Sequence, residues 1–207
     1  MTPMVEPPLR KRLKAKYHKS RFSEQQFLPL DIVDEQITED AIKAELSRKT
    51  PDRFRNRTLF SQVVEQAKKV FAVLVIIGEA QAIEALLQEG ITDKHLPLSR
   101  RGDDENDDVL VSHDGKAFPS FSQWEDDIRV DEFLDKQWIV QAPVLEYSSD
   151  ELKFSNKHAM PFLAAIKVTH TRFSSVWKTN IHPAHQRGFP VSFAVLIDFQ
   201  HAKRVRW

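Results

Sequence analysis

The sequence predicts an α+β fold, in which a mainly helical N-terminal region is followed by a small antiparallel sheet. Apolar residues recur at helical spacing in several segments between residues 37 and 88. After residue 161 the pattern changes to short segments rich in Val, Ile, Phe and Trp, which are typical of strands. The length of 207 residues suits one or two domains, and the hydrophobic fraction of 41% is that of a globular chain.

Charge balance and cysteine content exclude several classes of function. The 30 basic and 30 acidic residues cancel, so the net charge gives no reason to expect a nucleic acid or a membrane as partner. The absence of cysteine excludes disulfides, cysteine-liganded zinc and thiol nucleophiles, and it fits a reducing compartment. The apolar run at 70–77 is too short to span a bilayer, and residues 1–10 lack a signal-peptide core. We therefore expect a soluble intracellular protein, cytoplasmic or nuclear.

Residues 1–21 are predicted to form a basic, disordered tail. Pro3, Pro7 and Pro8 disfavour a helix at its start. The basic residues that follow are Arg10, Lys11, Arg12, Lys14, Lys16, Lys19 and Arg21. This pattern is typical of a mobile terminus surrounded by solvent, and the alternatives are a nuclear import signal or a phosphate-binding arm.

Residues 22–147 are predicted to be a helical region of four or five helices. Thr38 is a good N-cap with two acids after it, so a short helix should run to about Leu46. The strongest helical segment spans 59–75, and Gly78 fits its C-cap. A further helix at 79–88 should complete an αα-hairpin.

The rest of the helical region contains an acidic loop near 99–115 and an aromatic stretch at 118–140. The loop lacks the fixed alternating ligand positions of a calcium site, so we expect a solvated insertion there. The aromatic stretch should form one or two helices that pack in the core, with a peptide-binding groove as the alternative. His182 and His185 form an H-x-x-H pair, and His158 and His201 are available as further ligands. However, Pro183 lies between the two histidines, and they lack the helical H-E-x-x-H context of a zinc site. We expect a polar turn and no metal site.

Residues 148–207 should form three strands, at 162–168, 174–181 and 191–199, after a polar connector. Two parts of the chain carry a family resemblance. The first contains "AKKVFAVLVIIGEAQAIEALLQEGITDKHLPL", then "FSQWEDD" and "DKQWIVQAPVL"; the second reads "MPFLAAIKVTHTRFSSVWKTNIHPAHQRGF" and then "FAVLIDF". Together they resemble the N-terminal half of fungal protein-kinase-like proteins. The resemblance implies that the sheet is the start of a truncated protein-kinase N-lobe.

The resemblance also implies where a nucleotide would bind. In kinases, a Gly-rich loop lets the backbone approach the ATP phosphates, and a lysine on the next strand pairs with them. In this sequence the three glycine positions fall on Thr169, Thr171 and Ser174. The residue that covers the adenine is Val176, and Ala194 and Leu196 stand at the alanine and lysine positions of the next strand.

These replacements predict that the chain, as given, is not a working catalyst. Leucine cannot neutralise a phosphate, and no His-Arg-Asp or Asp-Phe-Gly motif follows in the required context. We expect a truncated, catalytically inactive kinase-like protein without catalytic residues or a cofactor, acting through protein contacts. One alternative is the regulatory N-terminal part of a longer active serine/threonine kinase, which would need ATP and magnesium. Another alternative is a stand-alone helical interaction module.

Overall fold

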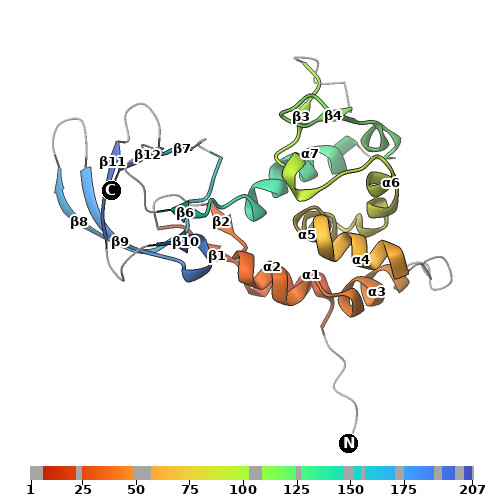
Figure 1. Ribbon diagram of the computed structural model, residues 1–207, viewed down its shortest axis with the longest axis horizontal. Helices are drawn as coiled ribbons and strands as arrows, with labels where there is room; N and C mark the ends of the chain where they lie inside the picture. The colour runs from red at the N-terminus through yellow and green to blue at the C-terminus, as the bar shows by residue number, and fades with distance from the viewer. Residues whose placement is uncertain are drawn as a thin grey trace, which may run out of the picture. The chain divides into compact units, whose positions relative to one another are not determined.

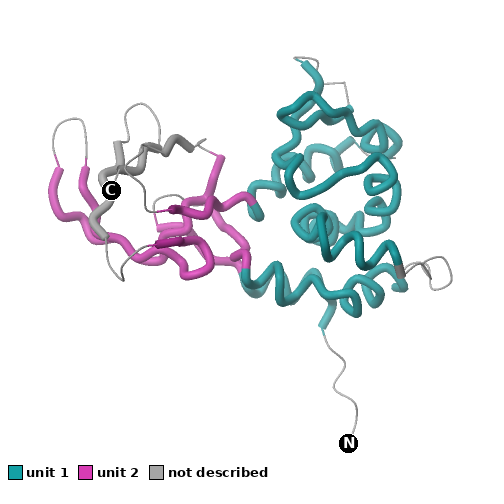
Figure 2. Tube along the Cα trace, in the orientation of Figure 1, with its two compact units in different colours: residues 1–16, 31–140 teal, residues 17–30, 141–207 magenta. Residues whose placement is uncertain are grey.

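The computed structural model divides the chain into two compact units, which Figure 2 colours separately. Unit 1 comprises Met1–Lys16 and Asp31–Val140, and unit 2 comprises Tyr17–Leu30 and Gln141–Trp207. The structure describes residues 7–21, 25–48, 57–102, 109–124, 127–146, 152–154, 157–170, 175–188, 193–198 and 203–206. The predicted α+β class is confirmed, because helices dominate unit 1 and an antiparallel sheet dominates unit 2.

Unit 1 is built from short helices and one small sheet (Figure 1). Its α-helices are α1 (Leu9–Ala15), α2 (Leu30–Gln36), α3 (Glu39–Ser47), α4 (Arg57–Gln66), α5 (Lys68–Ile77), α6 (Ile83–Gln88) and α7 (Asp127–Lys136). Its 3-10 turns are η1 (Ala80–Ala82), η2 (Asp93–His95), η3 (Pro119–Gln123) and η4 (Gln137–Val140). The antiparallel strands β3 (Ser99–Arg100), β4 (Leu110–Val111) and β5 (Ala117–Phe118) form its sheet. The strands β3 and β4 lie within the predicted acidic loop, whose acids at 103–108 are outside the described residues.

Helix α5 is the centre of unit 1. Every residue from Val70 to Ile77 is buried, which is expected for a helix that is apolar all round. The helix contacts α1, α4, α6 and α7. It ends at Gly78, whose φ of 94° lies in the left-handed region, and whose N–H donates to the carbonyl of Leu74. The predicted C-cap is therefore confirmed.

The predicted long helix at 59–75 is in fact two helices. Ala67 separates α4 from α5, with backbone angles of φ −140° and ψ 29° that are not helical. Its methyl side chain offers no hydrogen-bond acceptor to the first turn of α5. The apolar spacing continues through the break, so local pattern alone did not reveal it.

The N-terminus differs from the predicted disordered tail, because α1 forms within it. Leu9 and Leu13 lie four residues apart, on one face of the helix, and both are buried. Arg10 and Lys11 point to solvent. Burial of two leucines in unit 1 stabilises a seven-residue helix that would be marginal in isolation.

Unit 2 contains a five-stranded antiparallel sheet with the order β7-β12-β11-β9-β8. Its strands are β7 (Leu152–Phe154), β8 (Phe162–His170), β9 (Ser175–Ile181), β11 (Phe193–Asp198) and β12 (Lys203–Arg206). The three predicted strands correspond to β8, β9 and β11, with ends that differ by at most two residues. The strands β7 and β12 were not predicted.

The remaining strands of unit 2 are short. They are the antiparallel pair β1 (His18–Lys19) and β2 (Gln26–Phe27), and the parallel pair β6 (Leu145–Glu146) and β10 (Gln186–Arg187). The 3-10 turn η5 (Pro183–His185) lies between β9 and β10. Phe27, Ala142 and Ala159 form a buried cluster with Leu163 packed against it. Residues 17–30, which were predicted to be partly tail and partly helical region, thus belong to the strand-rich unit.

Candidate functional site

The residues that the resemblance assigns to a nucleotide site fall on β8, β9 and β11. Thr169 of β8 pairs with Val176 of β9, and Val176 pairs on its other side with Leu196 of β11. Ala194 pairs with Lys178, two positions along the same ladder. Thr171 and Ser174 lie outside the described residues. The register therefore brings Thr169, Val176 and Leu196 into one row across three strands.

The residues of this row do not have the chemistry of a phosphate site. Neighbouring strands lie about 5 Å apart, so Val176 is the direct neighbour of both Thr169 and Leu196. Thr169 is exposed and Val176 is half-buried. The row contains one hydroxyl group and two aliphatic residues, and it has no charge that could pair with a phosphate. A β-bulge lies between Lys167 and Thr169, where the ladder of β8 shifts its register.

The two histidines of the H-x-x-H pair make structural hydrogen bonds. His182 Nδ1 accepts the N–H of Ala184 at 3.2 Å, which caps η5. His185 Nε2 accepts the N–H of Leu30 at 3.2 Å, and its Nδ1 lies 3.1 Å from the carbonyl oxygen of Pro143. Since a carbonyl only accepts, Nδ1 must carry the proton, and the imidazole is neutral. The pair thus forms the polar turn that was predicted.

Ring packing surrounds this turn. His185 lies edge-on to Phe27, with ring centroids 5.4 Å apart and planes at 83°. His182 packs against His18 at 5.0 Å, also edge-on. Edge-to-face contacts of this kind stabilise cores. Within the described part of the chain, no three His, Asp or Glu side chains are grouped so that they could hold a metal ion.

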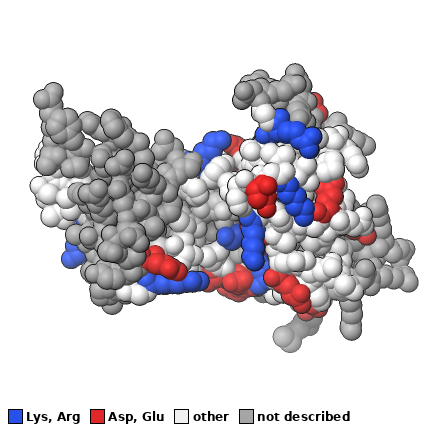
Figure 3. All heavy atoms as spheres, turned by 45° about the horizontal axis from the view of Figure 1, so that its top comes forward, with Lys and Arg blue, Asp and Glu red and all other residues white. Residues whose placement is uncertain are grey.

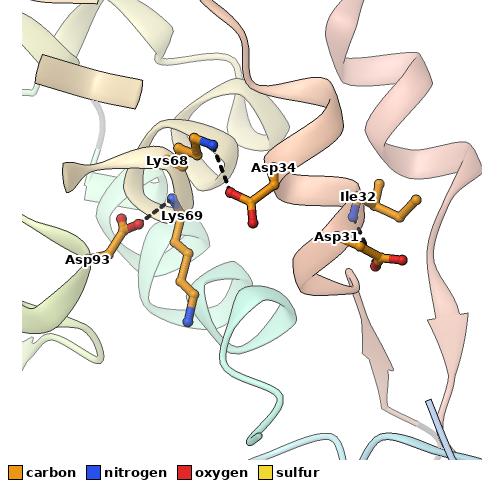
Figure 4. Close-up of polar contacts among 6 residues, drawn as sticks. All are labelled: Asp31, Ile32, Asp34, Lys68, Lys69 and Asp93. Carbon is orange, nitrogen blue, oxygen red and sulfur yellow. Dashed lines mark hydrogen bonds and ion pairs between the residues drawn. The ribbon is translucent and has the colours of Figure 1, made fainter. Parts of the chain in front are cut away.

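A second group of polar side chains lies at the start of α5, and Figure 4 shows it in close-up. Asp93, from η2, takes the place of the N-cap acceptor that Ala67 lacks. Its Oδ2 accepts the N–H of Lys69 at 3.1 Å, and its Oδ1 accepts the N–H of Val70 at 3.0 Å. One carboxylate therefore binds two of the amides that a helix leaves free at its N-terminus.

Burial shapes the ionisation of this group. Burial raises the pKa of Asp93 above its ordinary value, while the amides of Lys69 and Val70 and the charges of both lysines act in the opposite direction. Burial lowers the pKa of Lys69, although the charges of Asp93 and Asp34 partly offset this effect. The Lys69 side chain extends away from Asp93 in Figure 4. Burial thus disfavours the charged form of both the Asp93 and the Lys69 side chain.

The outer members of this group have local roles. Lys68 Nζ lies 2.7 Å from Asp34 Oδ1, but the Asp34 side chain is 70% exposed, so this ion pair contributes little to stability. Asp31 Oδ1 accepts the N–H of Ile32 at 3.0 Å within α2. The arrangement fixes where the central helix begins, and it holds no pair of groups placed for acid–base chemistry. Sequence reasoning missed Asp93, whose only local signal is the Thr-Asp pair at the start of η2.

Unit 1 also has a cavity of about 460 Å³ among α1, α2 and α3. Basic lining is provided by Arg12 and Arg48, and acidic lining by Glu35, Asp40 and Glu45. Arg48 Nε lies 3.7 Å from Glu45 Oε2. The two signs of charge nearly cancel, so the cavity has no preference for an anion or a cation. The face of the molecule drawn in Figure 3 likewise shows basic and acidic side chains interspersed over its described part.

Comparison with known proteins gives no family for this chain. No protein-family model, no curated protein and no solved structure matches it significantly. Among the described residues, no helix has the length and apolar character needed to cross a membrane.

Proposed function

We propose that this chain is a catalytically inactive protein-kinase-like protein that acts through protein contacts. One observation carries the proposal. Leu196, at the position that the resemblance assigns to the ATP lysine, pairs with Val176, at the position assigned to the adenine cover. The two positions that the resemblance assigns are thus neighbours in one ladder, while the residue type that phosphoryl transfer requires is replaced.

The order of elements supports the same proposal. The segment at Pro161 leads into the hairpin of β8 and β9, β9 ends at the turn that contains His182 and Pro183, and β11 follows. This is the order that the resemblance implies for the strand pair, the "IHP" turn and the lysine strand. A leucine cannot hold the α- and β-phosphates, and Thr169 at a glycine position adds a Cβ where backbone and phosphate would meet. Binding to protein is then the function that remains for a globular chain with balanced charge.

Thermal melting with and without Mg-ATP tests the proposal. We expect the melting temperature of the full chain to be unchanged by millimolar Mg-ATP, because a ligand that does not bind the folded state cannot stabilise it. An active protein kinase serves as positive control, and Mg²⁺ with inorganic phosphate controls for ionic effects. A saturable rise in melting temperature with Mg-ATP that is absent with phosphate would show that the chain binds nucleotide, and it would refute the proposal.

A stand-alone helical interaction module is the second candidate, and the compactness of unit 1 favours it. We infer that such a module would need α1, because Leu9 and Leu13 are buried in unit 1. A fragment of residues 1–143 should then melt cooperatively, whereas a fragment of residues 22–143, which lacks α1, should melt at a lower temperature. Non-cooperative melting of the longer fragment would count against the module.

A further inference from the structure

The strand β8 lies at the edge of the five-stranded sheet, so within this sheet it is paired on one side only, with β9. On the other side, Arg21 contacts only the beginning of the strand. Its N–H donates to the carbonyl of Phe162 at 3.1 Å, and its Nε donates to the carbonyl of Leu163 at 3.0 Å. Over residues 164–170, no other described segment pairs with this side. We call the outer side of residues 164–170 the β8 edge.

The β8 edge carries exposed apolar side chains. Ile166 is 68% exposed and Val168 is 61% exposed, and together with Ile128 on α7 they are the large hydrophobic residues that stand out in this way among those described. Proteins usually protect edge strands with proline, with charges, with β-bulges, or by covering them. The strand β8 has one lysine and a bulge beside Val168, but it contains no proline, and no other described segment covers residues 164–170. An edge of this composition is suited to the addition of a further strand.

Charge indicates which kind of strand fits. The strands β8 and β9 contain no aspartate or glutamate, while Lys167 and Lys178 are exposed. Lys167 Nζ lies 5.8 Å from the centroid of the Trp177 ring, so the charge lies over this hairpin. An approaching strand therefore meets apolar and basic groups and no acidic ones. Acidic residues would complement this edge across the strand pair.

A second copy of the chain fits this charge pattern poorly. Pairing of two β8 edges would place the two Lys167 side chains on neighbouring strands, and like charges across neighbouring strands are destabilising. An edge strand with acids in the alternate positions removes this repulsion. Charge complementarity thus favours a different protein over self-association.

We propose that the β8 edge binds an extended segment of a partner protein in which apolar and acidic residues alternate. Successive side chains of a strand point to opposite faces. Partner residues on one face contact Ile166, residues on the other face place a carboxylate beside Lys167, and Val168 in the bulge adds apolar area. The inference rests on the proposed function in that it assigns a protein partner, but it does not depend on the likeness to kinases.

Peptide binding to the full chain tests the inference. The probe is a fluorescent, end-capped peptide of sequence Thr-Val-Glu-Val-Glu-Val-Thr, and binding is followed by fluorescence anisotropy. We expect saturable binding that weakens at high salt. A matched peptide with lysine in place of both glutamates should bind at least about tenfold more weakly, or ~1.4 kcal/mol. Methylation of alternate backbone nitrogens should abolish binding, because strand addition depends on main-chain hydrogen bonds.

Two charge reversals locate the binding site. Lys167→Glu should weaken binding of the glutamate peptide about tenfold and strengthen binding of the lysine peptide. Lys178→Glu makes the same change in net charge on β9, which has a strand on each side, and should change affinity by less than about threefold. Circular dichroism and melting curves establish that both variants fold, and the gain in affinity for the lysine peptide cannot arise from unfolding.

Several results would overturn the inference. These are equal affinity for the two peptides, equal effects of the two reversals, or no binding at millimolar peptide. A concentration-dependent dimer that Ile166→Lys abolishes would assign the β8 edge to a second copy instead. The Mg-ATP experiment is independent of all these results, so failure of the peptide to bind is distinguishable from failure of the proposed function.

Discussion

Removing the carboxylate of Asp93 should destabilise the protein more than any other change to the charged residues at the start of α5. The Asp93→Ala variant leaves the N–H groups of Lys69 and Val70 without their acceptor, because Ala67 supplies none. Loss of an N-cap acceptor costs about 0.5–2 kcal/mol. A buried donor without a partner costs about 1–3 kcal/mol, and Val70 is fully buried whereas Lys69 is half-buried.

We therefore expect the free energy of unfolding to fall by about 2–3 kcal/mol. For a chain of this size, that change lowers the melting temperature by roughly 4–12 °C. Chemical denaturation followed by circular dichroism measures the first quantity, and thermal melting the second. Asp93→Asn should lower the free energy of unfolding by less than Asp93→Ala does, because the asparagine side chain keeps one acceptor oxygen.

The matched control is Asp34→Ala, which removes the carboxylate partner of the neighbouring Lys68. The Asp34 side chain is 70% exposed, so this variant should change the free energy of unfolding by no more than about 0.5 kcal/mol. If Asp93→Ala is as stable as Asp34→Ala, then the carboxylate does not hold the start of α5, and the reasoning is refuted.

Three further predictions concern other parts of the structure. The difference in free energy of unfolding between the natural protein and Asp93→Asn should become smaller as pH rises from 3.8. The reason is that burial raises the pKa of Asp93, so the folded state keeps this proton to a higher pH than the unfolded state does. Denaturation at several acidic pH values measures the difference, and an increase with pH would contradict the expected direction. Leu13→Ala should lower the free energy of unfolding by about 2–4 kcal/mol, since Leu13 is fully buried. The exposed control Lys14→Ala should lower it by less than about 0.5 kcal/mol. Equal melting temperatures of the two variants would mean that α1 does not pack against unit 1 in solution. His185→Ala should lower the free energy of unfolding by about 1–3 kcal/mol, because the N–H of Leu30 loses its acceptor. Exposed His170→Ala is the control, and similar values for the two variants would refute the role of His185 as this acceptor.

Periodicity and residue type were sufficient to predict several elements. The strands at 162–168, 174–181 and 191–199 appear as β8, β9 and β11, because β-branched and aromatic residues favour extended backbone. Thr38 caps α3 as predicted, since its hydroxyl accepts the N–H of Ala41 at 3.3 Å. Both signals lie within a few residues of the element that they define.

The candidate sites were less accessible from sequence. The family resemblance selected Thr169, Val176 and Leu196 one by one, and only the ladder register brings them into one row. The exposure of Ile166 and Val168 could not be predicted either, because the residue pattern of an apolar strand does not show whether the strand is central or at an edge of its sheet. Edge position depends on which strands the rest of the chain provides.

The sequence by itself determined the α+β class, the central apolar helix and the three main strands, because these depend on local spacing and composition. The tertiary structure alone decided that α4 and α5 are separate, that the basic N-terminus contains a helix, and that His185 accepts the N–H of Leu30. The physical reason is distance along the chain. Asp93 acts on amides 23 and 24 residues away, and His185 acts on an amide 155 residues away. Hydrogen bonds of this range satisfy groups that no local pattern can assign.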